Sequence, residues 1–226
     1  MFYEPDKANH GLKHDPYKSI VVPRPIGWIS TVSTEGRVNL APFSQFNNLG
    51  YDPPYVMFAA SNFPMSARPK DSVANVIETG GFVVNMATYA LREAINITSS
   101  AVEPTVDEAA LAGLEMIPSN LVKAPRVAAS PVHLECNYHC MLALPGRNLE
   151  QSHYVVVGRV VGVHIRDDVL TADGKLDVLK IRPIARLGYH DYTSVDSLFT
   201  MAPVGPGAEL RKSGLAGEPL PPRAAE

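Results

Sequence analysis

Short β-type runs separated by turn signals are the feature that most restricts how this chain can fold. The run over residues 25–32 is followed by a turn at 34–37 and a second run from Val38, and Tyr51–Pro54 forms another break. The valine and isoleucine of these runs suit strands because their branched Cβ atoms restrict χ1 and pack well on a pleated surface. We therefore expect strands over residues 25–32, 38–41, 55–60, 82–86 and 154–165.

Three helical segments interrupt the predicted strands. In residues 71–79 the apolar side chains recur on one face, and Asp71 can cap the start of the helix. Residues 91–97 predict a second helix. The capping-box spacing of Thr105 and Glu108 predicts a third helix that begins at Thr105.

Strands of this length, joined mostly by short turns, favour a closed antiparallel barrel because closure removes exposed sheet edges. The predicted fold class is therefore mainly β, a barrel with a few peripheral helices. Residues 1–203 form the predicted domain. From residue 204 to 226 proline, glycine, alanine and charged residues dominate, which predicts a C-terminal arm or tail.

Bulk composition excludes several classes of protein. The formal net charge of the 226 residues is -3, and no cluster of lysine and arginine indicates binding to a nucleic-acid backbone. No stretch approaches the length of about 18 apolar residues that spans a bilayer. The first residues lack the pattern of a signal peptide, and Cys136 and Cys140 are too few for a disulfide framework. We expect a cytoplasmic protein that binds neither membranes nor nucleic acid.

A series of motifs between Val22 and Tyr192 carries a resemblance to a known family. In chain order the motifs are RPIGWIST (24–31), NLAPFS (39–44), RPKDS (68–72) with Asn75 and Thr79–Gly80, FVVN (82–85), HYVVVGRV (153–160), and RLG (186–188) with Tyr192. In this order and spacing they resemble the flavin reductase-like family, which includes flavoredoxin. The resemblance covers about residues 16 to 203.

This resemblance implies a six-stranded Greek-key split β-barrel that forms a homodimer, with the flavin at or near the subunit interface. Family members reduce FMN or FAD with NADH or NADPH, often for a partner monooxygenase. Others carry electrons on a bound FMN, so a flavoredoxin-like electron-transfer protein reduced by a partner is the alternative. A third alternative is a pyridoxamine-phosphate-oxidase-like oxidase or a haem-handling protein on the same broad barrel, but no motif supports it.

Hydroxyl and cationic side chains are candidates for binding the FMN phosphate, which needs hydrogen-bond donors and positive charge. Ser30, Thr31 and Ser33 offer hydroxyls where a strand reaches its turn. Arg68 and Lys70 supply positive charge just before a predicted helix, whose N-terminus favours an anion. The alternative is that the hydroxyls occupy ordinary strand and turn positions and that both cations are solvated.

The segment after the first hairpin is the candidate for binding the flat isoalloxazine ring. Pro42 stiffens the backbone and lacks an N–H, whereas the N–H groups of Ala41, Phe43 and Ser44 are expected to be available. Ser44, together with Phe46 and Asn47 further along, could contact the ring edge or the ribityl chain. The alternative is a turn-rich connection between strands.

Two further residues are candidates. Trp28 is the only tryptophan and could shield the flavin or the dimer seam, although a tryptophan in an apolar run is usually part of the core. His153 begins a predicted strand, and by resemblance it lies near the open face of the flavin, where it would orient or steady the reduced ring as the catalytic candidate. A histidine at the barrel rim that bonds a backbone carbonyl is the alternative.

Other chemistries find little support. His133, Cys136, His139 and Cys140 suggest a metal site, but on a strand over 131–144 the two cysteines share one face and the two histidines the other, so no metal is expected. There is no P-loop and no Gly-x-Gly-x-x-Gly that opens a helix, so NAD(P)H would have to dock on the flavin face.

Overall fold

The computed structural model describes residues 1–62, 68–103, 105–201 and 204. Contacts along the chain separate a compact unit, Met1–Asp196, from the segment Ser197–Glu226. Nearly all of the predicted C-terminal arm, residues 205–226, lies outside the described residues. In the described part of the chain, no helix has the length and apolar character needed to cross a membrane.

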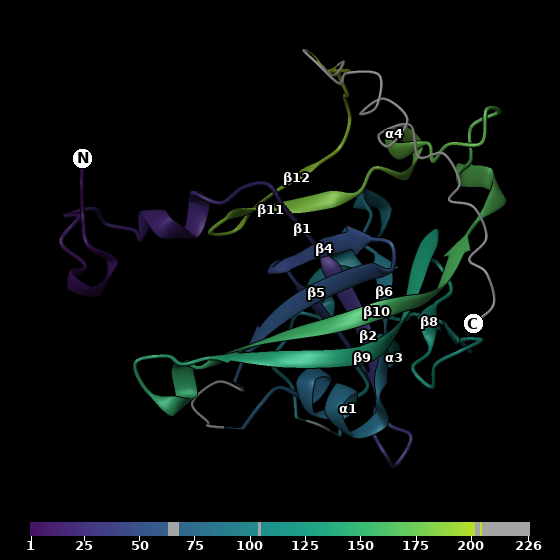
Figure 1. The fold of residues 1–226 in the computed structure, drawn as a ribbon, viewed down its shortest axis with the longest axis horizontal. Coiled ribbons are helices and arrows are strands. Elements are labelled where there is room, and N and C mark those ends of the chain that lie inside the picture. Colours follow the sequence, from purple (N-terminus) through teal and green to yellow (C-terminus); the bar gives the residue numbers. More distant parts are fainter. Residues whose placement is uncertain (63–67, 104, 202–203, 205–226) are drawn as a thin grey trace. The chain divides into compact units, whose positions relative to one another are not determined.

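Seven antiparallel strands form the main sheet, in the order β3-β2-β6-β9-β10-β5-β4. Figure 1 shows β4, β5, β10 and β9 in succession, with α1 below them. The strands are β2 (Gly27–Val32), β3 (Val38–Phe43), β4 (Phe46–Tyr51), β5 (Pro54–Ser61), β6 (Gly81–Met86), β9 (Val132–Leu144) and β10 (His153–Ile165).

The connection between β3 and β4 shows that this sheet is curled. These two strands lie at opposite ends of the strand order, yet only Ser44 and Gln45 separate them in sequence. Three Cα–Cα steps span at most about 11 Å, whereas six strand spacings in a flat sheet amount to about 29 Å. The sheet must therefore bend until its first and last strands meet. The backbone N–H of Ala59 on β5 donates to the carbonyl of Gln45 at 2.8 Å and fixes this corner.

Smaller elements surround the barrel. A three-stranded sheet has the order β1-β11-β12, and β7 pairs with β8. These strands are β1 (Arg24–Pro25), β7 (Met116–Ile117), β8 (Arg126–Val127), β11 (Ile184–Gly188) and β12 (Asp191–Ser194); the α-helices are α1 (Asp71–Thr79), α2 (Arg92–Ile97), α3 (Glu108–Leu111) and α4 (Val178–Ile181); 3-10 turns cover Pro5–Lys7, Pro16–Ser19, Tyr89–Leu91, Leu149–Gln151 and Asp167–Val169.

The mainly β class and the five predicted strands are confirmed, with ends that differ by a few residues. The expected six strands become seven in the main sheet. Within the main sheet, β4 is the strand that sequence reasoning missed, because asparagine and glycine at 47–50 are typical of turns. It forms because its neighbour β5 supplies an antiparallel partner on both sides of an irregularity at Leu49.

The predicted helices are also confirmed, but their N-caps were assigned wrongly. Lys70, not Asp71, is the N-cap of α1, and no side chain caps that end. The third helix begins at Glu108 instead of Thr105. Its cap is Asp107, whose carboxylate accepts the N–H of Ala110 at 3.0 Å.

Two groups of buried side chains form the core. Phe58 and Phe82 are fully buried with their ring centroids 5.3 Å apart, and α1 adds Val73 and Val76 to the same cluster. The second cluster is centred on Trp28, on the other face of β2. The barrel is thus packed with side chains, and a ligand site has to lie on its outside.

The histidine and cysteine residues of β9 do not follow simple alternation. A bulge between the pairs Cys140–Val157 and Tyr138–Gly158 shifts the phase at His139. Cys136 is therefore buried and Cys140 exposed, so the expectation that they share a face is wrong. Among the described residues no three histidine, cysteine or acidic side chains are grouped to hold a metal ion.

Gly158 provides a test of the core packing. A Cβ atom at this position would lie 2.5 Å from Cε1 of Phe82, a ring held on all sides by the core. We expect Gly158→Ala to lower the free energy of unfolding by about 1–3 kcal/mol through overpacking. Gly162→Ala on the same strand is the control, because its Cβ would have 3.4 Å to its nearest neighbours. Equal midpoints of urea denaturation for the two variants would contradict this account.

Candidate functional site

A series of connected hollows lies beside the corner between β3 and β4. The middle one, which we call the central groove, has a volume of about 380 Å³. Its lining comes from β1–β3, α2 and the β11–β12 hairpin, and consists of Ile26, Pro42, Ser44, Asn96, Ser99, Arg186, His190 and Tyr192.

At one end the central groove continues into what we call the Lys70 pocket, with which it shares Pro42 and Ser99. This pocket lies at the start of α1. It is lined by Asn39, Ala41, Pro42, Lys70, Asp71, Ser72, Thr98, Ser99, Ser100, Ala101, Val102 and Glu108.

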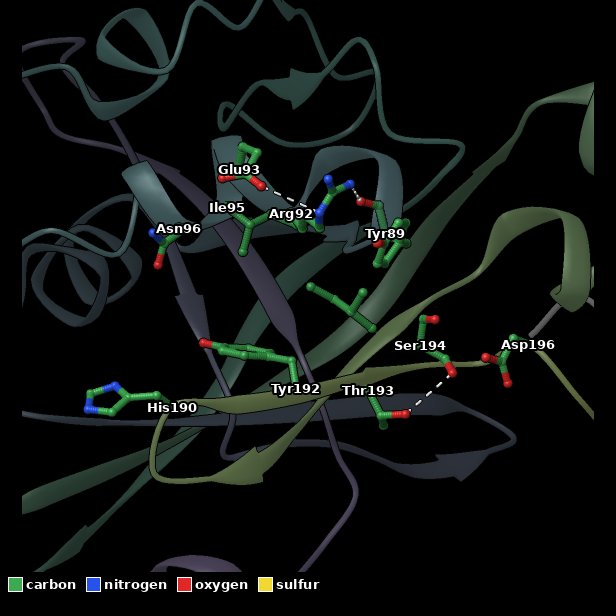
Figure 2. Close-up of a pocket in the computed structure, with 11 residues that line it drawn as sticks. Tyr89, Arg92, Glu93, Ile95, Asn96, His190, Tyr192, Thr193, Ser194 and Asp196 are labelled. Carbon is green, nitrogen blue, oxygen red and sulfur yellow. Dashed lines mark hydrogen bonds and ion pairs between the residues drawn. The ribbon is translucent and has the colours of Figure 1, made fainter.

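Two further hollows share His190 with the central groove. The first, the hairpin pocket of about 440 Å³, lies between α2 and β12. Figure 2 shows Tyr192 on β12 and His190 in the turn just before this strand, with Asn96 and Arg92 facing them from α2. The second, the basic pocket of about 770 Å³, is lined by His14, Lys18, Arg24, Ser44, Gln45, Arg186, Tyr189 and His190.

Lys70 is a half-buried cation with no counter-charge. Its Nζ lies 5.9 Å from the centroid of the Phe43 ring. No carboxylate oxygen of the described residues lies within ion-pair distance of it, since the neighbouring Asp71 pairs with Arg68 at 2.6 Å instead. Burial lowers the pKa of Lys70. An anion bound beside it would oppose that effect by stabilising the charged form.

Ser44 presents unused hydrogen-bonding groups to the central groove. Neither its N–H nor its hydroxyl is engaged by another described residue. It follows β3 directly at the corner, where the strand leaves its ladder with β2. A ligand in the central groove can therefore use both groups.

The outer edge of β3 is partly closed. The N–H of Leu40 donates to a carboxylate oxygen of Glu108 at 3.2 Å, so this N–H points away from β2. Because N–H directions alternate along an antiparallel strand, those of Ala41 and Phe43 point toward β2. The expectation that these two N–H groups are available to a ligand is wrong, while Pro42 has no N–H to leave unpaired on the open side.

Glu108 is a buried carboxyl group in the same pocket as Lys70. Burial raises its pKa above the ordinary value, and the nearby carboxylates of Asp71 and Asp107 act in the same direction. Hydrogen bonds from the backbone N–H groups of Glu108 and Leu40 oppose this effect only in part. The net shift favours the neutral acid.

A hydrogen bond from the core holds one wall of the site. The indole N–H of the fully buried Trp28 donates to the hydroxyl of Thr98 at 2.9 Å. Thr98 ends α2 and begins the stretch up to Val102 that lines the Lys70 pocket. The other wall depends on Arg186, which donates to the Tyr192 hydroxyl and stacks on that ring at 4.6 Å.

Comparison with known families identifies the fold. Residues 19–192 match the model of the flavin reductase like domain. This chain belongs to the flavin reductase-like family. This match confirms the resemblance that the motifs carry. The matched residues cover nearly all of the unit Met1–Asp196.

Solved structures support the same assignment. Nitrilotriacetate monooxygenase component B from Bacillus cereus matches with a TM-score of 0.80 and 28% identity, over 89% of this chain and 98% of that one. The 2-nitrobenzoate 2-nitroreductase of Pseudomonas fluorescens matches with a TM-score of 0.76 and 26% identity, over 90% and 96%. A Shewanella frigidimarina protein described as having a split barrel domain shares the fold at 21% identity and a TM-score of 0.75, over 91% and 100%.

Sequence relatives occur in distant bacteria. An uncharacterized protein of Aquifex aeolicus is 38% identical over 75% of this chain and 83% of its own length. Another from Halalkalibacterium halodurans is 33% identical over 89% and 95%. The aligned region therefore accounts for most of each chain.

The structure brings together only part of the predicted set of ligand-binding residues. Ala41, Pro42, Ser44 and Lys70 line the connected hollows, and Phe43 lies beneath Lys70. These residues come from two motifs that are separated in sequence, which supports reading them as one site.

Three predicted ligands are interior residues, because their side chains are fully buried and their polar atoms bond other parts of the protein. Ser30 donates to the carbonyl of Pro125, and Thr31 accepts from the Asn75 amide at 3.0 Å. Trp28 bonds Thr98, as described above. The side chains of these three residues stabilise the barrel and do not line the central groove.

The remaining predicted residues lie elsewhere. Ser33 accepts the N–H groups of Glu35 and Arg37 within its turn, and the exposed Arg68 pairs with Asp71. Phe46 packs against the core, Asn47 is exposed on β4, and His153 is exposed at the start of β10. None of these five lines the four hollows, so their roles toward a flavin stay predictions.

Sequence reasoning missed the opposite wall. Asn96, Ser99 and Ser100 come from the end of α2 and its loop, and His190 comes from the C-terminal hairpin. The RLG motif with Tyr192 was the available signal, since it matched the family but was not assigned to the site.

Glu108→Gln tests the electrostatics of the Lys70 pocket. A carboxyl whose pKa is higher in the folded than in the unfolded protein binds more protons when folded, so its contribution to stability falls as pH rises from about 4.5 through the folded pKa. We expect the glutamine variant to lose less stability than wild type between pH 4 and pH 7. Parallel stability–pH curves from urea denaturation would contradict a raised pKa for Glu108.

Proposed function

We propose that this protein binds FMN in the central groove and uses NADH or NADPH to reduce flavin. The observation that carries the proposal is Lys70, a half-buried cation at the uncapped start of α1 that has no ion-pair partner among the described residues. FMN joins a dianionic phosphate to a flat, largely apolar ring. The Lys70 pocket offers a cation for the phosphate, and the central groove offers the apolar surface of Ile26 and Pro42 for the ring.

The phosphate end of the site combines three kinds of donor. Lys70 supplies a charge, the first N–H groups of α1 face an end without a capping side chain, and the hydroxyl of Ser100 has no partner among the described residues. Glu108 lines the same pocket, where its carboxylate accepts the N–H of Leu40 at 3.2 Å. The residues present therefore fit a phosphate monoester.

The ring would occupy the central groove. Pro42 and Ile26 supply apolar surface, and the free N–H and hydroxyl of Ser44 supply donors for the polar edge of the ring. Bound there, the flavin supplies the chemistry of accepting a hydride from a nicotinamide and passing the electrons on. The protein orients the ring between β3 and the Tyr192 wall. FAD carries the same ring and is the alternative flavin.

An electron acceptor and a second subunit complete the proposal. The name of the Bacillus cereus neighbour, a monooxygenase component B, supports a partner monooxygenase. For a homodimer, the support is the exposed leucines Leu142, Leu144 and Leu149 on the β9–β10 hairpin, which Figure 1 shows projecting from the barrel. We also propose a cytoplasmic location.

Anaerobic absorbance spectroscopy tests the reductase activity. Protein reconstituted with FMN is mixed with NADH or NADPH in the absence of oxygen. We expect the absorbance band of oxidised flavin to bleach. A bound flavin band that persists with both donors would contradict the reductase and would indicate an electron carrier that waits for a protein donor.

Lys70→Ala tests the phosphate site. Loss of a charge-assisted hydrogen bond should weaken FMN binding by about 1.5–3 kcal/mol, measured by flavin fluorescence titration. Because the pKa of Lys70 is lowered, wild-type affinity should also fall at alkaline pH, whereas Lys70→Arg should keep its affinity there.

Lys123→Ala is the matched control for this experiment. Lys123 is exposed, has no partner among the described residues and lines none of the four hollows. Equal FMN affinity in the Lys70 and Lys123 variants would remove Lys70 from the site.

A further inference from the structure

His190 occupies the point where three hollows of the site meet. It lines the central groove, the hairpin pocket and the basic pocket, and no other described residue lines all three. Only Tyr189 and His190 lie between the end of β11 and the start of β12, so this side chain comes from the tip of the hairpin. A ligand in any of the three hollows lies within its reach.

The imidazole of His190 has no partner in the described part of the chain. No hydrogen bond, ion pair or ring contact joins it to another described residue. Figure 2 shows the ring projecting from the turn that precedes β12. An imidazole carries at least one N–H in either tautomer and in the charged form. His190 can therefore donate a hydrogen bond to a ligand without breaking an existing one.

The turn that carries His190 is fixed by its neighbours. Gly188 packs so closely on the backbone of Lys18 that an added Cβ would overlap the Lys18 carbonyl. Tyr189 has a left-handed φ of 46°, and its hydroxyl donates to the carbonyl of Asp15 at 3.2 Å. A residue other than glycine keeps this conformation only where surrounding contacts determine it. These contacts hold the backbone beside His190 and do not use its side chain.

Hydrogen-bonding side chains gather at this end of the central groove. Ser44, Arg186 and His190 line both the groove and the basic pocket, and none of them lines the Lys70 pocket. Arg186 already donates to a hydroxyl and to a backbone carbonyl, so it contributes mainly its charge. When the flavin phosphate lies at Lys70, these three residues are the ones available to the polar edge of the ring.

The charges around His190 favour a ligand that becomes more negative. Cations outnumber acids along the three hollows: the cations are Lys18, Arg24, Arg92 and Arg186, and the acids are Glu93 and Asp196. Glu93 is in addition paired with Arg92 at 3.4 Å. The positive potential that remains stabilises added negative charge on a ligand.

Reduction makes a flavin more negative. A hydride brings two electrons and one proton, so the neutral oxidised ring becomes a reduced ring with one negative charge, and the nicotinamide that gives up the hydride is left oxidised. A hydrogen bond to a charged acceptor is stronger than one to a neutral acceptor. A donor at the polar edge therefore binds the reduced ring more tightly than the oxidised ring.

We propose that His190 donates a hydrogen bond to the polar edge of the bound flavin and thereby raises its reduction potential. The proposal rests on the proposed function, because it takes the central groove as the flavin site. It concerns a residue that the family motifs do not include, since His190 stands between the RLG motif and Tyr192.

The test uses three variants of His190 in the full-length protein. His190→Ala removes the donor, whereas His190→Asn and His190→Gln place an amide N–H near the former positions of Nδ1 and Nε2. His139→Ala is the control, because His139 is also exposed but lines none of the four hollows. Fluorescence titration measures the affinity for oxidised FMN, and anaerobic equilibration with reference dyes measures the midpoint potential of the bound FMN.

We expect His190→Ala to weaken the binding of reduced FMN about tenfold more than that of oxidised FMN, which lowers the two-electron midpoint potential by about 30 mV. At least one amide variant should recover most of this shift, and the control should match wild type. Equal potentials in wild type and His190→Ala would overturn the proposal. A shift that neither amide variant recovers, or that His139→Ala reproduces, would overturn it as well.

The same measurements separate this proposal from the reductase activity, because the dyes report the potential without NADH or NADPH. Flavin that stays oxidised with both donors, in a protein whose potential depends on His190, would refute the reductase and leave the role of His190 in place. Flavin that is reduced by either donor, at a potential that does not depend on His190, would refute only the role of His190. A protein that binds no FMN would refute both.

Discussion

The two-residue connection between β3 and β4 is the constraint on which the rest of the structure depends. It joins the first and last strands of a seven-stranded sheet and so forces the sheet to curl into a barrel. The interior of that barrel is filled by Phe58, Phe82 and their neighbours, which leaves no room for a cofactor there. At the corner itself, Ser44 has left the ladder with β2, and no other described residue engages its N–H or its hydroxyl. Closure thus produces both the packed core and the polar floor of the groove.

The walls of the groove come from segments that the barrel holds in place. The Trp28–Thr98 hydrogen bond ties the end of α2 to the core, and the β11–β12 hairpin adds Arg186 stacked on Tyr192. Cationic side chains lie at both ends of the site. Lys70 lies at one end and the basic pocket at the other, with uncharged Pro42 and Asn96 between them. FMN has a corresponding arrangement of a phosphate and a flat ring, which is the physical basis of the proposed flavin site.

Strand positions and the family could be predicted from the sequence because valine-rich runs and ordered motifs are local signals. The direction in which each side chain points could not be predicted from the sequence. Ser30 and Thr31 have the chemistry of phosphate ligands, but β2 is covered on both faces, so their hydroxyls bond Pro125 and Asn75 instead. The β4 strand was missed because pairing with β5 outweighs the turn preference of its residues. The opposite wall of the groove depends on contacts between α2 and the C-terminal hairpin, which lie far apart in the sequence.

A crystal structure of the FMN complex tests the central claim most directly, namely that the groove beside the β3–β4 corner is the flavin site. The account predicts that the ring lies against Pro42 and within hydrogen-bond distance of Ser44, with the phosphate bound by Lys70. A ring bound beside His153 at the start of β10, or a phosphate held away from Lys70, would contradict it.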